Sequence, residues 1–316
     1  LIIIPDGVLG HLPFETFLVE KAPEQKVAYN ELHYLIKDFQ ISYNYSANLW
    51  KENNAATTRK NNGQILGMAA NYKVRLDSTK QDWRLYADRE LRELLRPLPA
   101  ARKEVEALQE NFQGFFAFDM MASETMFKEN AADFGIIHLA MHGLLNSQEQ
   151  VLSSLAFTEI SDSAENNFLC AYEITKMELN ADLVVLSACE TGYGKFERGN
   201  GIASLARSFM YAGVPAMVVT LWQVNDQATA LIMENLYNNL AEGMTKDEAL
   251  RQAKLEYMDS AKGITAHPAF WSPSIMIGNT NPITISRKMS YLFWMLVGGG
   301  GILALGLLFV LVRPKK

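Results

Sequence analysis

Short runs of apolar residues alternate with segments of helical periodicity along most of the chain. Several runs are continuous stretches of Ile, Leu and Val, a pattern typical of parallel strands that are buried on both faces. The predicted strands are residues 1–4, 64–69, 136–140, 183–186, 216–221 and 274–277. The alternation of strands with helices predicts an α/β fold, a mostly parallel sheet with helices on both faces.

The segments between these strands contain residues that commonly begin or end helices. Helices are predicted to begin at Pro99, near Ile202, at Asp226 and after a capping box formed by Thr245 and Glu248. The Asn-rich segment 44–63 predicts an exposed loop. Residues 1–4 predict a buried strand, and a chain that starts within a core strand is expected to be the C-terminal piece of a longer protein.

The C-terminal part of the chain has a different pattern. Residues 291–312 carry no charge, and their length matches the roughly 20 apolar residues that cross a bilayer. Tyr291 and Trp294 lie at the start of this stretch and basic residues follow it, as at membrane interfaces. The predicted organisation is a globular domain at 1–278, a linker at 279–289, a single transmembrane helix in membrane lipid at 290–312 and a basic tail at 313–316.

The side of the membrane on which the domain lies stays open. Arg313, Lys315 and Lys316 follow the predicted span, whereas Arg287 and Lys288 precede it. By the positive-inside rule this difference favours a cytoplasmic tail and a domain on the opposite side. A tail anchor that holds the domain in the cytoplasm is the alternative.

Composition and charge exclude several classes of function. The formal net charge is −6, and Lys and Arg form no cluster of the kind that binds phosphates, so nucleic acid is not an expected partner. The two cysteines, Cys170 and Cys189, are too few for a disulfide framework or a structural zinc site. We expect neither a metal nor a cofactor.

Two of the predicted strands run directly into reactive residues. His142 follows the strand at 136–140, and Cys189 follows the strand at 183–186. If these parallel strands are neighbours, the imidazole and the thiol meet at the same edge of the sheet. A free thiol has a pKa of about 8.5, so a nearby base is needed to activate it. The pattern predicts Cys189 as a nucleophile and His142 as its base.

Further features of the two segments agree with this chemistry. The backbone N–H groups of Gly143 and Cys189 could together hold an oxyanion. The two predicted catalytic residues lie roughly 50 positions apart, as in caspase-type enzymes. An inert, core-packed thiol is the alternative for any cysteine at a strand end, and it suits Cys170 better than Cys189, which precedes a polar, Gly-rich turn. His138, deeper in the apolar run, is predicted to be a core histidine.

The segments His142-Gly143 and 187–192 (Ser-Ala-Cys-Glu-Thr-Gly) resemble the two hallmark motifs of the CHAT domain family, caspase-like cysteine peptidases related to separases. Further likeness lies at residues 5–7, 12–15, 98–100, 104–105, 205–209, 212–215 and 220–226. The resemblance implies a caspase-like fold, a cysteine endopeptidase with a His142–Cys189 dyad, a protein substrate and a bacterial source. Because many members carry helical repeats before this domain, it also implies regulation by N-terminal helical repeats outside this chain.

Substrate specificity is the least defined feature. The implied caspase-like fold has a pocket beside the catalytic strands for the residue before the cleaved bond. Residues that follow the strand at 216–221 could line this pocket, namely Trp222, Gln223, Asn225 and Asp226. An aspartate there would favour a basic residue by pairing with it. The alternative is that Asp226 is the N-cap of the next helix, and the two roles are not exclusive. The alternative to a peptidase is a non-catalytic caspase-like scaffold at the membrane.

Overall fold

A computed structural model describes residues 1–22, 28–55, 62–72, 95, 97–146, 149–160, 165–187, 202–222 and 226–288. The chain divides into two units, Leu1–Ser286 and Arg287–Lys316. The predicted transmembrane helix at 290–312 and the basic tail at 313–316 lie outside the described residues. Within the part of the chain that is described, no helix is long and apolar enough to cross a membrane.

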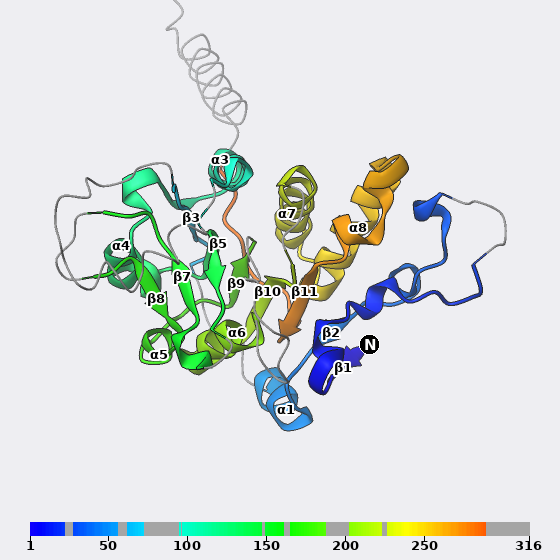
Figure 1. Ribbon diagram of the computed structural model, residues 1–316, viewed down its shortest axis with the longest axis horizontal. Helices are drawn as coiled ribbons and strands as arrows, with labels where there is room; N and C mark the ends of the chain where they lie inside the picture. Colours follow the sequence, from blue (N-terminus) through cyan, green and yellow to red (C-terminus); the bar gives the residue numbers. More distant parts are fainter. Residues whose placement is uncertain are drawn as a thin grey trace, which may run out of the picture. The chain divides into compact units, whose positions relative to one another are not determined.

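The first unit is built on a mostly parallel sheet, as predicted. In the described residues its strand order is β1-β2-β11-β10-β9-β5-β3-β4 (Figure 1). Neighbouring strands are parallel, apart from the antiparallel pair β10 and β11. The strands are β1 (Ile2–Ile3), β2 (Ser42–Tyr43), β3 (Ile65–Ala69), β4 (Gly114–Phe118), β5 (Ile136–Ala140), β9 (Leu183–Leu186), β10 (Ala216–Thr220) and β11 (Ser274–Gly278).

A small antiparallel sheet follows β5 in the chain. It consists of β6 (Gly143–Leu144), β7 (Ser154–Ala156) and β8 (Phe168–Cys170), in that spatial order. Its first strand begins directly after His142, so this sheet continues from the carboxyl end of β5. The candidate histidine therefore lies at the junction of the two sheets.

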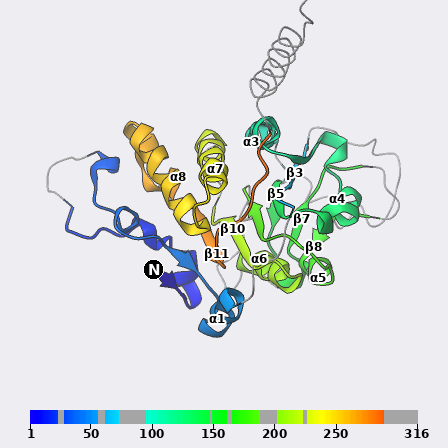
Figure 2. The same cartoon turned by 180° about the vertical axis from the view of Figure 1, so that it is seen from behind.

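Helices cover both faces of the large sheet (Figures 1 and 2). One face carries α3 (Pro99–Asn111), α7 (Asp226–Ala241), α8 (Lys246–Ser260) and α9 (Pro268–Trp271), and the other carries α4 (Glu124–Asn130), α5 (Ala171–Ile174) and α6 (Ile202–Tyr211). Short 3-10 helices are found at Gly7–His11, Phe14–Thr16, Tyr29–Glu31, Leu35–Lys37, Asp119–Met121, Ala131–Asp133, Gln150–Leu152 and Gly263–Ala266.

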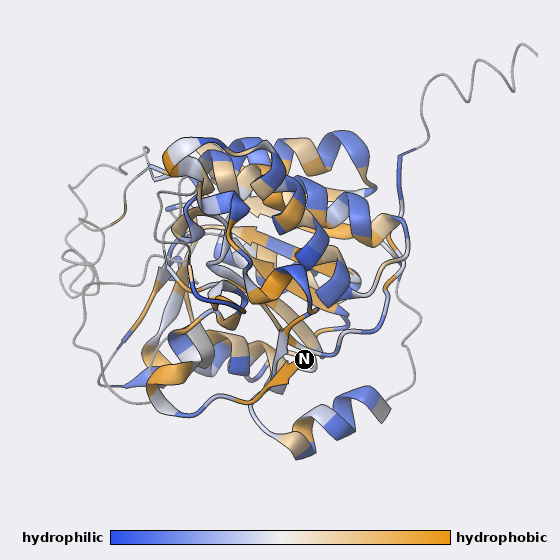
Figure 3. Cartoon of the chain, turned by 90° about the vertical axis from the view of Figure 1, so that its right-hand side faces the viewer, coloured by the Kyte–Doolittle hydropathy of each residue, from blue (hydrophilic) through white to orange (hydrophobic). Residues whose placement is uncertain are grey.

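The two helical layers explain the continuous apolar runs of the sequence. On β5, Ile137 and Leu139 pack toward α4, α5 and α6, whereas Ile136 and His138 face α3 and α7. Successive residues of a strand point to opposite faces, so a strand covered on both sides needs apolar residues at nearly every position. Figure 3 shows the result: the strands are mainly hydrophobic, and the helices over them mix hydrophobic with hydrophilic residues.

The prediction of a buried N-terminal strand is wrong. Leu1, Ile2 and Ile4 are 50%, 46% and 45% exposed. The strand, β1, is only two residues long and lies at the edge of the sheet, where it pairs with β2. A hydrophobic run of this length has the same sequence pattern at an edge as in a core, so the pattern could not distinguish the two positions.

Two predicted irregular segments contain ordered structure. The segment 44–63, predicted as a loop, includes α1 (Ala47–Ala55), whose low apolar content hid its helical character. The predicted linker at 279–289 begins as part of the domain, because Ile283 is buried and the Ser286 N–H donates to the Gly63 carbonyl at 2.8 Å. The compact unit therefore extends through Ser286.

The predicted capping box at the start of α8 is not formed. Thr245 is the N-cap of the helix, as expected, but its hydroxyl makes no hydrogen bond to the helix backbone. It donates instead to the Asp247 carboxylate at 2.7 Å. An acceptor two residues away competes here with the capping geometry.

Candidate active site

The candidate site lies where three adjacent strands end at the same edge of the sheet. Leu139 on β5 pairs with Leu186 on β9, and Leu186 pairs with Val219 on β10. The Ser187 N–H continues the pairing by donating to the Leu139 carbonyl at 3.2 Å. β5 and β9 are therefore parallel neighbours, which was the condition for bringing the two predicted catalytic segments together.

His142 is held at the end of β5 by its backbone and by its ring. Its N–H donates to the Tyr72 hydroxyl at 2.9 Å, and its carbonyl accepts from the Ala156 N–H at 2.9 Å. The imidazole lies against the Tyr72 ring with 4.8 Å between ring centroids and 42° between planes. The residue is 1% exposed, so these contacts define its position closely.

Gly143 begins β6 and is paired with Leu155 on β7. The hydrogen bond from the Ala156 N–H to the His142 carbonyl flanks this pair, so Gly143 and Leu155 form a non-hydrogen-bonded pair of the antiparallel ladder. In such a pair the N–H groups point away from the partner strand. β6 is an edge strand of the small sheet in the described residues, so the N–H of the buried Gly143 points away from β7.

The segment that leads to the predicted nucleophile is tied to β10. The Thr220 hydroxyl lies 3.2 Å from the Leu186 carbonyl oxygen and 3.3 Å from that of Ser187. Ser187 is itself buried. The described residues stop at Ser187, and Cys189 lies outside them. The chain thus leaves β9 from a fixed point two residues before Cys189.

The structure describes only part of the predicted substrate pocket. Trp222 follows β10, and its indole N–H donates to the Ala269 carbonyl at 3.2 Å, which joins the end of β10 to α9. Asp226 is the first residue of α7. Gln223, Asn225 and the side chain of Asp226 lie outside the described part. The pocket and the capping role of Asp226 therefore stay predictions.

His138 is a core histidine, in agreement with the prediction. It is fully buried, with Nδ1 3.0 Å from the Tyr237 hydroxyl and Nε2 3.0 Å from a carboxylate oxygen of Glu104. Tyr237 and Glu104 come from α7 and α3, so the imidazole links both helices to β5. Its two ring nitrogens face these partners, and His138 is thereby assigned a structural role.

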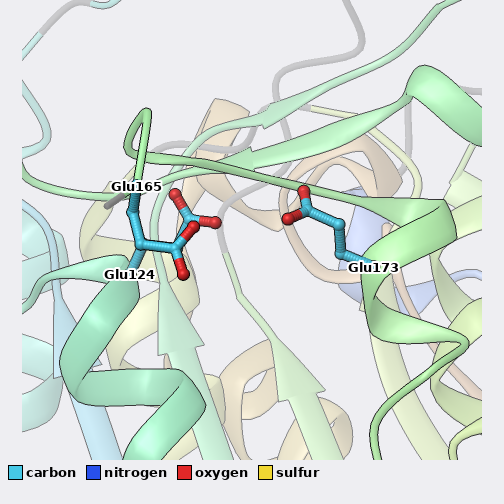
Figure 4. A group of neighbouring side chains, drawn as sticks. All are labelled: Glu124, Glu165 and Glu173. Atoms are coloured by element: carbon cyan, nitrogen blue, oxygen red, sulfur yellow. The ribbon is translucent and has the colours of Figure 1, made fainter. Parts of the chain in front are cut away.

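Glu124, Glu165 and Glu173 form an acidic cluster that no sequence pattern indicated. Their carboxylates point toward a common space (Figure 4). The Lys128 ammonium lies in that space, 2.8, 2.7 and 2.9 Å from the three carboxylates. Burial raises the pKa of Glu124 to about 7, against the opposing effect of Lys128. The Lys128 ammonium lies where a metal ion would bind between the three carboxylates. We therefore assign the cluster a structural role.

Tyr72 is the site residue that sequence reasoning missed. It lies three residues after the end of β3, and β3 is the neighbour of β5 on the side away from β9. The sequence feature that could have indicated Tyr72 as a site residue is its position directly after a predicted buried strand. That signal was insufficient, because the sequence does not state which strands are neighbours.

Comparison with known families identifies the domain. The model of the CHAT domain matches residues 1–279. The chain belongs to the CHAT domain family. The match confirms the resemblance found in the motifs around His142 and Cys189, and it extends from the first residue to the end of β11. The mixed α/β architecture described above is therefore that of a CHAT domain.

Individual proteins resemble this CHAT domain over part of their length. Over 111 residues, 35% of the chain, it is 29% identical to tetratricopeptide repeat protein 28 of Mus musculus and of Homo sapiens. The matched segment makes up 4% of each of these relatives. The curated relatives are animal proteins, and a bacterial source for this CHAT domain stays a prediction.

Two solved structures have partial similarity to this chain. The structure of the Saccharomyces cerevisiae separase–securin complex is similar with a TM-score of 0.42 and 12% identity, over 77% of this chain and 14% of that one. The structure of the Arg-specific cysteine proteinase gingipain R is similar with a TM-score of 0.46 and 8% identity, over 78% of this chain and 56% of that one.

Proposed function

We propose that this CHAT domain is a cysteine endopeptidase in which Cys189 is the nucleophile and His142 the base. The observation that carries the proposal is the register of β5 and β9. Leu139 and Leu186 are paired, and His142 and Cys189 each follow their paired residue by the same number of positions. Neighbouring strands are about 4.8 Å apart, a separation that an imidazole and a thiol can bridge.

The chemistry follows from these two side chains. His142 accepts the thiol proton of Cys189, and the resulting thiolate attacks the carbonyl carbon of the peptide bond. The C–N bond then breaks, and the imidazolium returns its proton to the leaving amine. Water attacks the thioester that remains, with His142 again as base, which releases the acid and restores the thiol.

Gly143 supports stabilisation of the tetrahedral intermediate. Its N–H is not used in the pairing with β7, so it is free of the ladder and is available to a developing oxyanion. The N–H of Cys189 would supply the second donor. We expect a larger residue at position 143 to crowd the reacting carbonyl, which glycine avoids because it has no side chain.

The proposal extends to substrate and regulation. Trp222, Gln223, Asn225 and Asp226 would line the pocket, with Asp226 selecting a basic residue before the cleaved bond. Helical repeats would bind near the domain and control it, in keeping with the name of the tetratricopeptide repeat relatives. A single membrane helix at 290–312 would tether the enzyme.

Alkylation of the thiol tests the proposal without knowledge of the substrate. We expect iodoacetamide to label Cys189 much faster than Cys170 at pH 6.5, and we expect His142→Ala to abolish the difference. His33→Ala, which removes an imidazole that is 40% exposed, is the matched control and leaves the rate unchanged. Equal labelling of both cysteines, or labelling that is indifferent to His142, would refute an activated thiol.

A second experiment separates an enzyme from a scaffold. Cys189→Ala is used to trap protein partners, and each trapped partner is then incubated with the wild-type domain. A peptidase cuts at least one partner, and the product ends reveal the residue before the cleaved bond. If partners bind equally to both forms and none is cut, the domain is a scaffold.

A further inference from the structure

The Tyr72 hydroxyl stands inside the hydrogen-bond ladder that leads to His142. We propose that Tyr72 is the positioning residue of the catalytic base, holding His142 through its hydroxyl and its ring. This inference rests on the proposed peptidase function. It concerns a residue that lies 70 positions from His142 in the chain and belongs to neither hallmark motif.

The ladder between β6 and β7 shows how the hydroxyl acts. After the pair of Gly143 and Leu155, His142 and Ala156 are the next residues opposite each other. Such a pair normally exchanges two direct N–H···O bonds. One is present, from the Ala156 N–H to the His142 carbonyl at 2.9 Å.

Tyr72 replaces the second bond. The His142 N–H donates to the Tyr72 hydroxyl at 2.9 Å, and the hydroxyl donates to the Ala156 carbonyl at 2.7 Å. The inserted oxygen satisfies both backbone groups. The His142 N–H is thereby held through the Tyr72 hydroxyl instead of by a direct bond to β7.

The Tyr72 ring restrains the imidazole as well as the backbone. The two rings lie 4.8 Å apart and are tilted by 42°. Aromatic rings at this separation are in direct contact and favour a defined mutual orientation. One residue thus restricts both the main chain and the side chain of His142.

Tyr72 is itself anchored by its neighbour Asn71. The Asn71 N–H donates to the Thr158 hydroxyl at 2.8 Å, and its side-chain amide donates to the Asp119 carboxylate at 2.6 Å. Asp119 also accepts from Arg102 at 2.7 Å. Hydrogen bonds from Asn71 and Arg102 lower the pKa of Asp119, so this carboxylate is ionised and retains both partners at neutral pH.

The pH profile of thiol alkylation tests this role. In the wild type, His142 should sustain iodoacetamide labelling of Cys189 well below the ordinary thiol pKa of about 8.5. Tyr72→Phe removes the hydroxyl bridge, and Tyr72→Leu removes the bridge and the ring contact. We expect the profile to move to higher pH in Tyr72→Phe and further in Tyr72→Leu. If the profile moves up by about one pH unit, the labelling rate at pH 6.5 falls about tenfold.

A matched control and circular dichroism separate positioning from folding. Tyr257→Phe also removes one hydroxyl bond to a carbonyl, that of Thr265, and should leave the profile unchanged. If the Tyr72 variants fold and their pH profiles coincide with that of the wild type, the inference is wrong. If Tyr72→Leu does not fold, the profile of Tyr72→Phe alone tests the inference. A wild-type profile that is independent of His142 overturns the proposed function instead.

Discussion

Leu139 on β5 and Leu186 on β9 are paired in register, and the Ser187 N–H extends their ladder to the last described residue before Cys189. In the sequence, His142 and Cys189 each follow their paired leucine by the same number of positions. Adjacent parallel strands keep a nearly constant separation, so covalent cross-linking can test whether the two residues lie opposite each other.

His142→Cys in a Cys170→Ala background should form a disulfide with Cys189 under mild oxidation. Disulfides require Cα atoms about 4.4–6.8 Å apart, which neighbouring in-register positions provide. Non-reducing electrophoresis after proteolysis, or mass spectrometry of the linked peptides, detects the bond. Leu145→Cys in the same background is the control. Position 145 is three residues further along the chain than position 142, so this cysteine should not cross-link to Cys189. The reverse result would mean that Cys189 does not lie opposite His142.

Glu104 and His138 are predicted to depend on each other for stability. Both are buried, and their closest atoms are 3.0 Å apart. His138→Leu leaves the Glu104 carboxyl group without this polar neighbour in the core and should lower the free energy of unfolding by about 1–3 kcal/mol. Adding Glu104→Leu removes the buried polar group that has lost its neighbour, so the double variant should be more stable than the sum of both single losses. Urea unfolding of the four proteins measures the coupling, and additive losses would contradict it.

The pH dependence of stability should carry a contribution from Glu124. Its pKa is about 7 in the folded protein against an ordinary 4.5, with burial as the main cause. Between these values the folded state binds more protons than the unfolded state, so this contribution falls as the pH rises from about 4.5 to 7. Glu124→Gln removes the ionisable group.

Chemical unfolding at several pH values measures this effect. The stability of the wild type relative to Glu124→Gln should decrease from about pH 4.5 to 7 and then level off. Glu129→Gln, an exposed change on the same helix, is the control and should follow the wild type at every pH. A difference between wild type and Glu124→Gln that does not vary with pH would show that Glu124 titrates at its ordinary pKa.

The segment around Glu15 should pack less firmly against α8 when the buried Lys254 ammonium is removed. The Lys254 ammonium lies 3.2 Å from one carboxylate oxygen of Glu15, and the Tyr43 hydroxyl donates to the other at 2.5 Å. Lys254→Met should lower the free energy of unfolding by about 3–5 kcal/mol, because a buried charge loses its partner.

Hydrogen exchange locates the effect of Lys254→Met. Faster exchange is expected in the N-terminal segment that contains Glu15 and in β2, which Glu15 and Lys254 connect to α8. Lys103→Met, an exposed change on α3, should leave exchange unaltered. Uniform exchange across the domain in Lys254→Met would show that the pair does not secure the N-terminal segment in particular.

Local sequence patterns predicted much of the fold. The runs that became β3, β5, β9, β10 and β11 were correctly placed, because strands covered on both faces are apolar at nearly every position. The very short strands β2 and β6 carried too little pattern to be recognised. The exposure of β1 was missed because the burial of an edge strand depends on what packs against it.

The sequence by itself determined the types of the main elements and placed His142 and Cys189 just after two buried strands. Periodicity reports which residues are buried, so this information is local. Only the tertiary structure decided that β5 and β9 are neighbours in register, and that Tyr72 reaches His142 from the end of β3. Strand order and register depend on pairing and packing between distant segments, whose free energies no short stretch of sequence contains.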